Sequence, residues 1–144
     1  MRRFFKITGL IVLLACLVPT GFWIAAQMRE SQPASALKPE NGQFVETAGG
    51  RIHVSVWGAP DALPVLMTHG MAAWGGLWED TAQQLAGRGY RVIAMDLAPF
   101  GFSDRSDGDF SRSHQAERLN QLAQALKLED YILVGHSYGG GVAL

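Results

Sequence analysis

The residue with the clearest chemical potential is a serine near the end of the 144-residue chain, Ser137. It lies at the centre of residues 135–139, which read Gly-His-Ser-Tyr-Gly and follow an apolar run at residues 131–134. A serine at this spacing directly after a buried strand is typical of a tight strand-to-helix turn that exposes the hydroxyl. In such a turn, side chains at Gly135 or Gly139 would collide with neighbouring backbone. The pattern therefore predicts a serine nucleophile suited to acyl transfer.

Two further motifs would complete a site for this chemistry. An oxyanion hole needs two backbone N–H donors near the nucleophile. Tyr138, the residue after the serine, is one expected donor, and Met71, directly after the His-Gly pair at residues 69–70, is the other. Residues 96–104 form the third motif, which begins with an acidic residue after the next apolar run. Gly-x-Ser-x-Gly alone is a weak signal in a chain with 17 glycines, but the order and spacing of all three motifs favour a catalytic turn.

None of the four histidines is expected to be the general base. His69 is interpreted as structural, with its ring bonded to nearby backbone. His136 is adjacent to the nucleophile, and neighbouring side chains on a sharp turn point apart. His53 and His114 have no motif around them, and we expect both at the surface. A serine hydroxyl is a weak nucleophile without a base, so the partner of Ser137 has to come from elsewhere.

Other motif residues are interpreted as supports. Asp96 ends an expected strand and should order the loop that follows, whereas Asp104 is interpreted as a solvated loop or capping residue. The ring of Tyr138 has two open interpretations, because it could line an acyl pocket or only pack. The residues expected to support the motifs are His69, Gly70, Asp96, Gly135 and Gly139.

Hydrophobic periodicity places the motifs on layered strands and helices. Strands are expected at residues 44–47, 51–57, 64–68, 90–95 and 131–134. Helices are expected at residues 76–87 and 113–128. The first two strands form a hairpin, and the continuous apolar runs of the last three are typical of parallel strands covered on both faces. The sequence thus predicts an α/β fold in which helices flank a mostly parallel sheet, with right-handed crossovers.

Together, residues 69–71, 96–104 and 135–140 resemble the α/β-hydrolase superfamily, in the branch that contains esterases, lipases and C–C bond hydrolases. The resemblance covers residues 43–144 and implies that the motifs mark the ends of the third, fourth and fifth of eight strands. Pro99 stands where the family segment usually has glycine. Dehalogenases and epoxide hydrolases of this fold carry Asp at the nucleophile position, so Ser137 argues against both. The implied reaction is hydrolysis of an ester or related acyl bond of a small molecule through an acyl-enzyme, with no metal or organic cofactor.

The acid and the histidine of a catalytic triad do not follow the serine within this sequence. In this fold the triad runs Ser, Asp or Glu, then His along the chain. Only seven residues follow Ser137, and none can serve as acid or base. We therefore expect a domain truncated after the nucleophile turn, inactive by itself, with an exposed apolar edge at its last strand. The abrupt end favours a fragment or an incomplete gene model. A non-catalytic binding protein of the same fold, or an inactive fragment, is the alternative.

The N-terminus is predicted to be a single-pass membrane anchor over residues 1–30. Residues 7–28 carry no charge, and 22 helical residues span about 33 Å, enough to cross the hydrocarbon core. Arg2, Arg3 and Lys6 precede this run. The positive-inside rule then places the N-terminus in the cytoplasm and the catalytic-type domain outside it.

Two processed forms compete with the uncleaved anchor. A signal peptide usually has an apolar stretch of about 7–15 residues and a small-residue cleavage site, and this segment is longer and lacks a clean site. Residues 13–16, Leu-Leu-Ala-Cys, resemble a lipobox, but cleavage before Cys16 would leave an apolar mature start. Residues 31–42 are expected to be a polar linker, and residues 43–144 the partial hydrolase domain.

Composition excludes two other classes of protein. There are 12 basic and 13 acidic residues, a formal net charge of -1, so the chain lacks the basic footprint of a nucleic-acid binder. Cys16 is the single cysteine, which excludes a scaffold held by intrachain disulfides. The expected partners are a small acyl substrate and the membrane.

Overall fold

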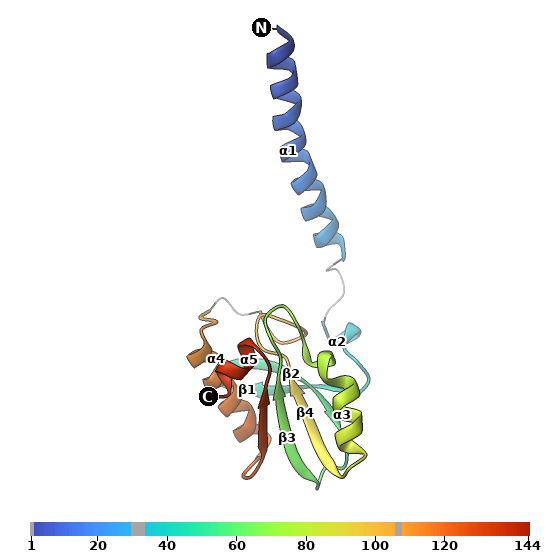
Figure 1. Ribbon diagram of the computed structural model, residues 1–144, viewed down its shortest axis with the longest axis vertical. Helices are drawn as coiled ribbons and strands as arrows, with labels where there is room; N and C mark the ends of the chain where they lie inside the picture. The colour runs from blue at the N-terminus through green and yellow to red at the C-terminus, as the bar shows by residue number, and fades with distance from the viewer. Residues whose placement is uncertain (1, 30–33, 106–107) are drawn as a thin grey trace. The chain divides into compact units, whose positions relative to one another are not determined.

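The computed structural model describes residues 2–29, 34–105 and 108–144, and the chain divides into two compact units, Met1–Leu37 and Lys38–Leu144. The first unit contains helix α1 (Arg2–Arg29) and the short helix α2 (Ala34–Leu37), labelled in Figure 1. Helix α2 falls within the segment predicted as a linker, whose residues 31–33 lie outside the described residues.

Helix α1 has the length and composition of a membrane-crossing helix over Lys6–Arg29, and its described side chains are exposed. An apolar surface of this kind needs an apolar environment. Pro19 lies inside the helix, and the Thr20 hydroxyl donates a 2.8 Å hydrogen bond to the carbonyl of Cys16, one turn earlier. A signal sequence would have the same features, so the helix fits either a membrane span or a signal.

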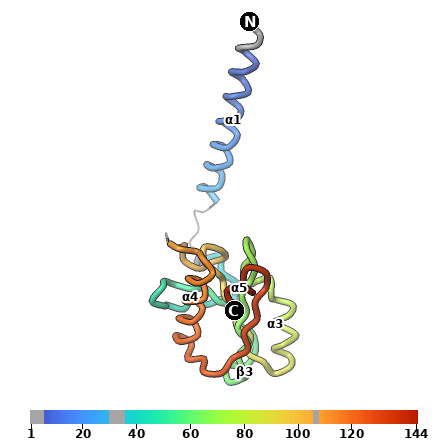
Figure 2. Tube along the Cα trace, turned by 60° about the vertical axis from the view of Figure 1, so that its left-hand side comes forward, coloured from blue at the N-terminus to red at the C-terminus, as the bar shows by residue number. Residues whose placement is uncertain are grey.

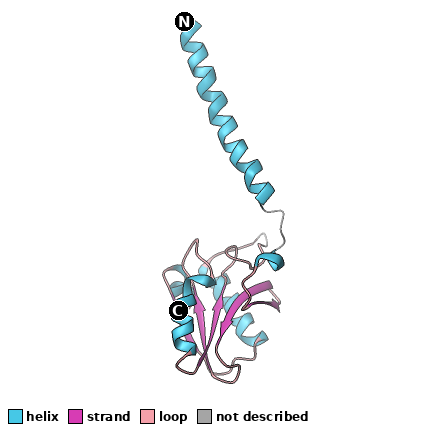
Figure 3. Ribbon diagram, turned by 90° about the vertical axis from the view of Figure 1, so that its right-hand side faces the viewer, coloured by secondary structure: helices cyan, strands magenta, loops and turns pink. Residues whose placement is uncertain are grey.

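The second unit is built on a five-stranded mixed sheet, which forms the central layer in Figure 3. Its strands are β1 (Gly42–Thr47), β2 (Gly50–Trp57), β3 (Leu63–Thr68), β4 (Tyr90–Met95) and β5 (Ile132–Gly135). The spatial order is β1-β2-β4-β3-β5. Strands β1, β2 and β4 pair antiparallel, whereas β4, β3 and β5 pair parallel. The carboxyl ends of β3, β4 and β5 therefore meet at one edge, where the three sequence motifs follow.

Helices cover both faces of the sheet. The helical elements are a 3-10 turn η1 (Gly75–Trp78), α3 (Glu79–Ala86), α4 (Arg112–Ala125) and α5 (Tyr138–Val142). Figure 2 shows α3 and α4 on opposite sides of β3. Successive side chains of β3 point to opposite faces, so this strand contributes to both cores. Leu66 joins the core under α4 and α5, whereas Val65 and Met67 join the core under α3.

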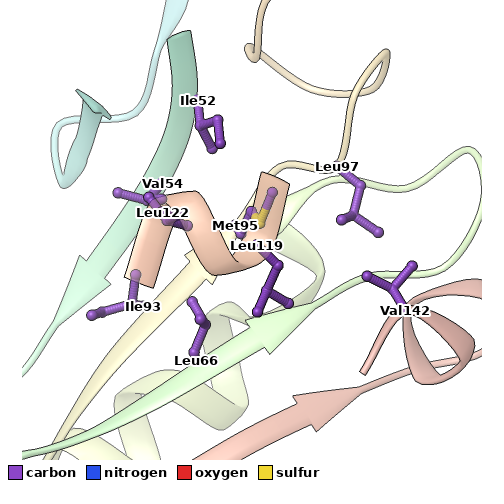
Figure 4. Packing of buried hydrophobic residues seen from close by; sticks show 9 residues of the cluster. All are labelled: Ile52, Val54, Leu66, Ile93, Met95, Leu97, Leu119, Leu122 and Val142. Atoms are coloured by element: carbon purple, nitrogen blue, oxygen red, sulfur yellow. The ribbon is translucent and has the colours of Figure 1, made fainter. Parts of the chain in front are cut away.

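The larger core lies on the α4 and α5 side of the sheet (Figure 4). Its buried members are Ile52, Val54, Leu66, Ile93, Met95, Leu97, Leu119, Leu122 and Val142. Strand residues and helix residues contribute to the same cluster, so burial of these side chains fixes the helix layer against the sheet. The predicted α/β class, with helices flanking the sheet, is confirmed.

The helix boundaries differ from the sequence prediction. The helix expected at residues 76–87 is divided, since a 3-10 turn comes first and the α-helix begins at Glu79. Two acidic residues, Glu79 and Asp80, occupy the first turn of α3, where their negative charges interact favourably with the positive end of the helix dipole. The second expected helix, residues 113–128, begins at Arg112 because the Ser111 hydroxyl accepts from the His114 N–H, and it ends at Ala125.

Candidate active site

The turn that carries Ser137 has the backbone geometry of a strained elbow. Strand β5 ends at Gly135, helix α5 begins at Tyr138, and Ser137 between them has φ 53° and ψ -116°. A non-glycine residue with positive φ costs on the order of 1–3 kcal/mol and persists only where its surroundings enforce it. The serine side chain is exposed, so its hydroxyl is open to a substrate.

The glycines on either side of the serine are required by close backbone approach. A Cβ at Gly135 would lie 2.6 Å from the Cα of Gly140. A Cβ at Gly139 would lie 2.5 Å from the carbonyl oxygen of His69. Both distances are far inside van der Waals contact, which confirms the steric reason inferred from the sequence.

The loop after β3 lies directly beside the serine. The His136 N–H donates to the Thr68 carbonyl at 3.1 Å, and the Thr68 hydroxyl donates to the Gly139 carbonyl at 3.1 Å. Gly70 then passes so close that a Cβ there would lie 3.2 Å from the Cβ of Ser137. The fold thus brings the His-Gly motif and the serine motif together, as the shared edge of β3 and β5 requires.

The two predicted oxyanion donors lie in the loop after β3 and at the start of α5. Met71 follows Gly70 in the loop that contacts the serine, and its side chain is exposed. Tyr138 is the first residue of α5, and first-turn N–H groups of a helix have no intrahelical acceptor.

The imidazole of His69 is buried and bonded to backbone at both nitrogens. Its Nε2 lies 2.9 Å from the Leu97 N–H, and its Nδ1 lies 2.7 Å from the carbonyl of Gly70. An N–H can only donate and a carbonyl can only accept, so the ring carries its proton on Nδ1. Burial lowers the pKa of His69 below its ordinary value, partly opposed by the Gly70 carbonyl and the charge of Asp96. This neutral ring connects the loops after β3 and β4.

Asp96 joins three segments through its carboxylate. Oδ1 accepts from the Gly75 N–H at 2.5 Å, and Oδ2 accepts from the Phe102 N–H at 2.8 Å. The second oxygen also lies 2.9 Å from Nδ1 of His53, and both side chains are fully buried. The expected loop-ordering position of Asp96 is therefore what the structure shows.

The surface position predicted for His53 is wrong. Its side chain is fully buried between β1 and the 96–104 loop, with the Phe44 and Phe102 rings 5.4 and 5.0 Å from its own. The neighbouring Ser103 hydroxyl accepts from the His53 N–H at 2.9 Å and donates to the Asp96 carbonyl at 2.7 Å. The physical reason is that this end of β2 is covered on both faces, which alternating hydrophobicity does not reveal.

The other predicted residues lie outside this buried cluster. His136 is exposed, and its ring lies edge-on to Trp78 with centroids 6.4 Å apart. The Tyr138 hydroxyl donates to the Phe110 carbonyl, which favours a packing role for that ring. Asp104 is half-exposed and pairs with the Arg51 guanidinium at 3.0 Å, so it anchors its loop to β2.

An open cavity of about 360 Å³ lies between the loops after β3 and β4. Its walls carry the aromatic side chains of Trp74, Phe100 and Phe102, together with Ala72 and Ala73. Sequence reasoning missed these aromatic residues as site candidates. Their proximity in sequence to residues 69–71 and to residues 96–104 is the signal that could have identified them.

Comparisons with known proteins agree with this architecture. The family model described as alpha/beta hydrolase fold matches residues 64–144. The 2-hydroxymuconate semialdehyde hydrolase of Pseudomonas sp. (strain CF600) is 36% identical over 111 residues, which cover 74% of this chain and 38% of that protein. This chain belongs to the α/β-hydrolase family. It spans about a third of the length of the curated relatives it matches.

Solved structures give the same result. An esterase from Exiguobacterium antarcticum matches with a TM-score of 0.66 and 34% identity, over 71% of this chain and 38% of that one. An epoxide hydrolase from Vigna radiata matches with a TM-score of 0.66 and 27% identity, over 70% of this chain and 33% of that one. A membrane phospholipase A matches with a TM-score of 0.69 and 26% identity, over 99% of this chain and 46% of that one. The last match extends through the N-terminal helix.

Proposed function

We propose that Ser137 is the nucleophile of a membrane-anchored hydrolase that cleaves acyl esters through an acyl-enzyme. The observation that carries the proposal is the positive-φ backbone of Ser137, held between a parallel strand and a helix beside Gly70. This geometry exposes a hydroxyl at the edge of the sheet, where we expect backbone N–H groups from two loops to converge. Esterase structures among the matches are consistent with it.

In the proposed reaction the Ser137 oxygen attacks the ester carbonyl carbon while its proton passes to a general base. The carbonyl oxygen becomes negatively charged and is stabilised by the N–H groups of Met71 and Tyr138. The C–O bond to the alcohol then breaks, the alcohol leaves with the proton, and the acyl group remains on Ser137. Water attacks the acyl-enzyme in the same way and releases the acid.

The histidines described above are poorly suited to be the base. Both ring nitrogens of His69 are committed to backbone partners, and His53 is buried against Asp96. We therefore assign the base and its acidic partner to residues outside 1–144, in accordance with the chain order of triads in this fold. The serine at position 137 also favours ester chemistry over the epoxide hydrolysis of some structural matches.

A fluorophosphonate probe tests the nucleophile directly, because it reacts with activated serines. In the full-length protein, we expect labelling that Ser137→Ala abolishes. The matched control is Ser113→Ala, an exposed serine on α4, which should label like the wild type. Labelling that persists in Ser137→Ala would contradict the assignment. Absence of labelling in the wild-type protein would favour the alternative, a non-catalytic binding protein of this fold.

Helix α1 is proposed to be an uncleaved anchor, with the N-terminus in the cytoplasm and the hydrolase domain on the other side. The excess of basic residues before the uncharged run at residues 7–28 supports this orientation. We expect the full-length protein to stay in the membrane fraction after alkaline extraction and to release only when residues 1–30 are deleted. Mass spectrometry of the mature N-terminus separates the alternatives, since a mature chain that begins at Cys16 or later would show processing.

Phospholipid esters are the first substrates to test. The match to a membrane phospholipase A covers 99% of this chain, whereas the other solved structures named above cover 70–71%. That match includes the apolar helix that would bring the domain to a lipid surface. We expect release of fatty acid from phospholipid vesicles by the full-length protein, and none from Ser137→Ala.

A further inference from the structure

We propose that the side chains of Tyr138 and Arg112 form a clamp that positions one oxyanion donor of the proposed reaction, the backbone N–H of Tyr138. The clamp joins helix α5, which follows the nucleophile, to the amino end of α4, and the two helices lie side by side (Figure 1). The inference rests on the proposed function, because it gives these side chains a part in the reaction of Ser137. Both act through the backbone of α5, so they are positioning groups.

Helix α5 is weak by composition. Residues 139–141 are three consecutive glycines, and glycine is the least favourable residue in a helix apart from proline. At position 139 the close approach of the His69 carbonyl requires glycine. A first turn of this kind fixes the direction of the Tyr138 N–H poorly by itself. An oxyanion donor, however, has to be placed to within about 0.5 Å.

The hydroxyl of Tyr138 ties this turn to a residue outside the helix. It donates to the Phe110 carbonyl, just before α4, and the ring packs against the larger core. Tyr138 therefore carries the proposed oxyanion donor at its backbone and is held through its hydroxyl by a residue 28 positions earlier in the chain. A rotation of the Tyr138 backbone would pull the hydroxyl away from its acceptor.

The side chain of Arg112 crosses α5 near its end. A Cβ at Gly141 would lie 2.9 Å from Cδ, 3.0 Å from Nε and 3.2 Å from Cζ of Arg112. These are the three atoms nearest to such a Cβ, so the arginine lies against the backbone of Gly141. A side chain at position 141 would displace it. Glycine at this position thus lets Arg112 reach α5.

The segment that makes these contacts is itself held in place. The Asp109 carboxylate accepts from the N–H of Ser111 at 2.7 Å and from its hydroxyl at 2.8 Å, and these bonds lower the pKa of Asp109. Phe110 lies between these two residues in the chain. Further along α4, the buried Gln115 amide donates to the Ala98 carbonyl at 2.7 Å. The start of α4 can therefore support the weaker helix α5.

A loosely held donor should slow the chemistry more than it weakens binding of the ester. The carbonyl oxygen becomes charged only as the reaction proceeds, so the Tyr138 N–H contributes most in the transition state. Complete loss of one oxyanion donor costs about 10²–10³-fold in kcat. A donor that is retained but less well aligned should cost about tenfold, with little change in affinity for the uncharged ester.

Tyr138→Phe removes the hydroxyl and keeps the ring. In the full-length protein with p-nitrophenyl butyrate, we expect the burst rate constant at saturating ester to fall about tenfold, while the ester concentration that gives half of this rate stays within about twofold. Affinity for 1,1,1-trifluorododecan-2-one, whose serine adduct carries an oxyanion, should fall by about the same factor. Tyr131→Phe, at another tyrosine packed against the larger core, is the matched control and should behave like the wild type. An unchanged burst rate constant and inhibitor affinity in Tyr138→Phe would overturn the clamp.

Arg112 is tested by rescue. Arg112→Ala should lower the burst rate constant about threefold, whereas Arg88→Ala, at an exposed arginine after α3, should not. Adding Gly141→Ala fills the space that Arg112 leaves and favours the helix. We therefore expect Arg112→Ala/Gly141→Ala to regain most of the wild-type rate. A double variant as slow as Arg112→Ala would contradict the role of Arg112 in holding α5.

Hydrogen exchange separates the clamp from the proposed function, because it needs no turnover. Amides of residues 138–144 in the full-length protein should exchange at least about fivefold faster in Tyr138→Phe than in the wild type. Faster exchange in a protein whose Ser137 takes no fluorophosphonate would keep the contact and remove its part in catalysis. Labelling of Ser137 with exchange and burst rates unchanged in Tyr138→Phe would keep the nucleophile and remove the clamp.

Discussion

The turn at Ser137 and the cluster around Asp96 lie at the same edge of the sheet, after β5 and β4. They differ in solvent exposure, in backbone geometry and in the contacts that hold them. Ser137 is exposed and has a positive φ, and it lies in a turn where a side chain at Gly135 or Gly139 would collide with backbone. Asp96 is fully buried, and both of its oxygens accept hydrogen bonds. One site exposes a hydroxyl at a cost in backbone strain, and the other uses polar atoms to fix loops. The proposed chemistry and the loop architecture are thus divided between the ends of β5 and β4, on either side of β3.

The largest expected effect separates catalysis from strain. Ser137→Ala and Ser137→Gly both remove the hydroxyl, and each should lower kcat/KM by at least about 10³-fold. Only glycine relaxes the positive φ, so Ser137→Gly should be more stable than Ser137→Ala by about 1 kcal/mol. Urea denaturation of the two full-length variants checks this. Equal midpoints would show that the turn stores no strain.

Asp96→Ala tests how much the buried cluster around Asp96 stabilises the fold. Removing the carboxylate leaves the Gly75 and Phe102 N–H groups and the ring of His53 without their acceptor, and should cost about 3–5 kcal/mol of unfolding free energy. Asp96→Asn retains one acceptor oxygen and should lose less. Asp61→Ala, at an exposed aspartate before β3, should change stability by less than about 0.5 kcal/mol. A small loss of unfolding free energy in Asp96→Ala would contradict the role of Asp96 as the anchor of both loops.

The pH dependence of stability should report His69. Burial lowers its pKa in the folded protein, so the unfolded state binds the proton more readily. This contribution to stability is complete above the ordinary pKa of 6.5 and is lost as pH falls through the lowered folded value. His69→Phe should cost about 1–3 kcal/mol at pH 8, because the Leu97 N–H loses its acceptor, and should remove this acid dependence.

Two outcomes decide the His69 prediction. His114→Phe, at a partly exposed histidine on α4, should keep the wild-type pH dependence. If denaturation midpoints between pH 8 and pH 5 fall as steeply in His69→Phe as in the wild type, the acid sensitivity arises elsewhere.

The smallest effect is expected at His136. Although it precedes the nucleophile in sequence, its ring packs against Trp78, and His136→Ala should keep kcat/KM within about threefold. A general base contributes on the order of 10²–10⁴-fold. A loss of about 10²-fold or more with an unchanged KM would identify His136 as the base and contradict the assignment made here.

The sequence predicted most of the fold because its signals are local. The apolar runs of β3, β4 and β5 and the glycines around Ser137 report their own environment, and the strands lie where periodicity put them. The burial of His53 could not be predicted in the same way. Its partner Asp96 is 43 residues away in the chain, and both faces of β2 are covered only after the 96–104 loop folds over it. The 3-10 turn before α3 likewise depends on the Gly75–Asp96 hydrogen bond, a tertiary contact.

The candidate site shows the same division. The motif positions Gly70 and Gly139 were predictable, since their spacing alone implies close backbone approach to the serine turn. The aromatic cavity was not, because Trp74 and Phe102 come from two loops that meet only when β3 and β4 pair. Signals within one segment identify the candidate nucleophile, whereas its surroundings depend on contacts between segments.

Trapping the acyl-enzyme would show which residue carries the acyl group. Full-length protein is mixed with p-nitrophenyl decanoate, quenched in acid within the first turnover, digested, and mapped by mass spectrometry. We expect a decanoyl adduct on Ser137, together with a burst of p-nitrophenol that approaches one equivalent per protein. A burst with the adduct on another residue, or turnover with no adduct on the peptide containing Ser137, would contradict it.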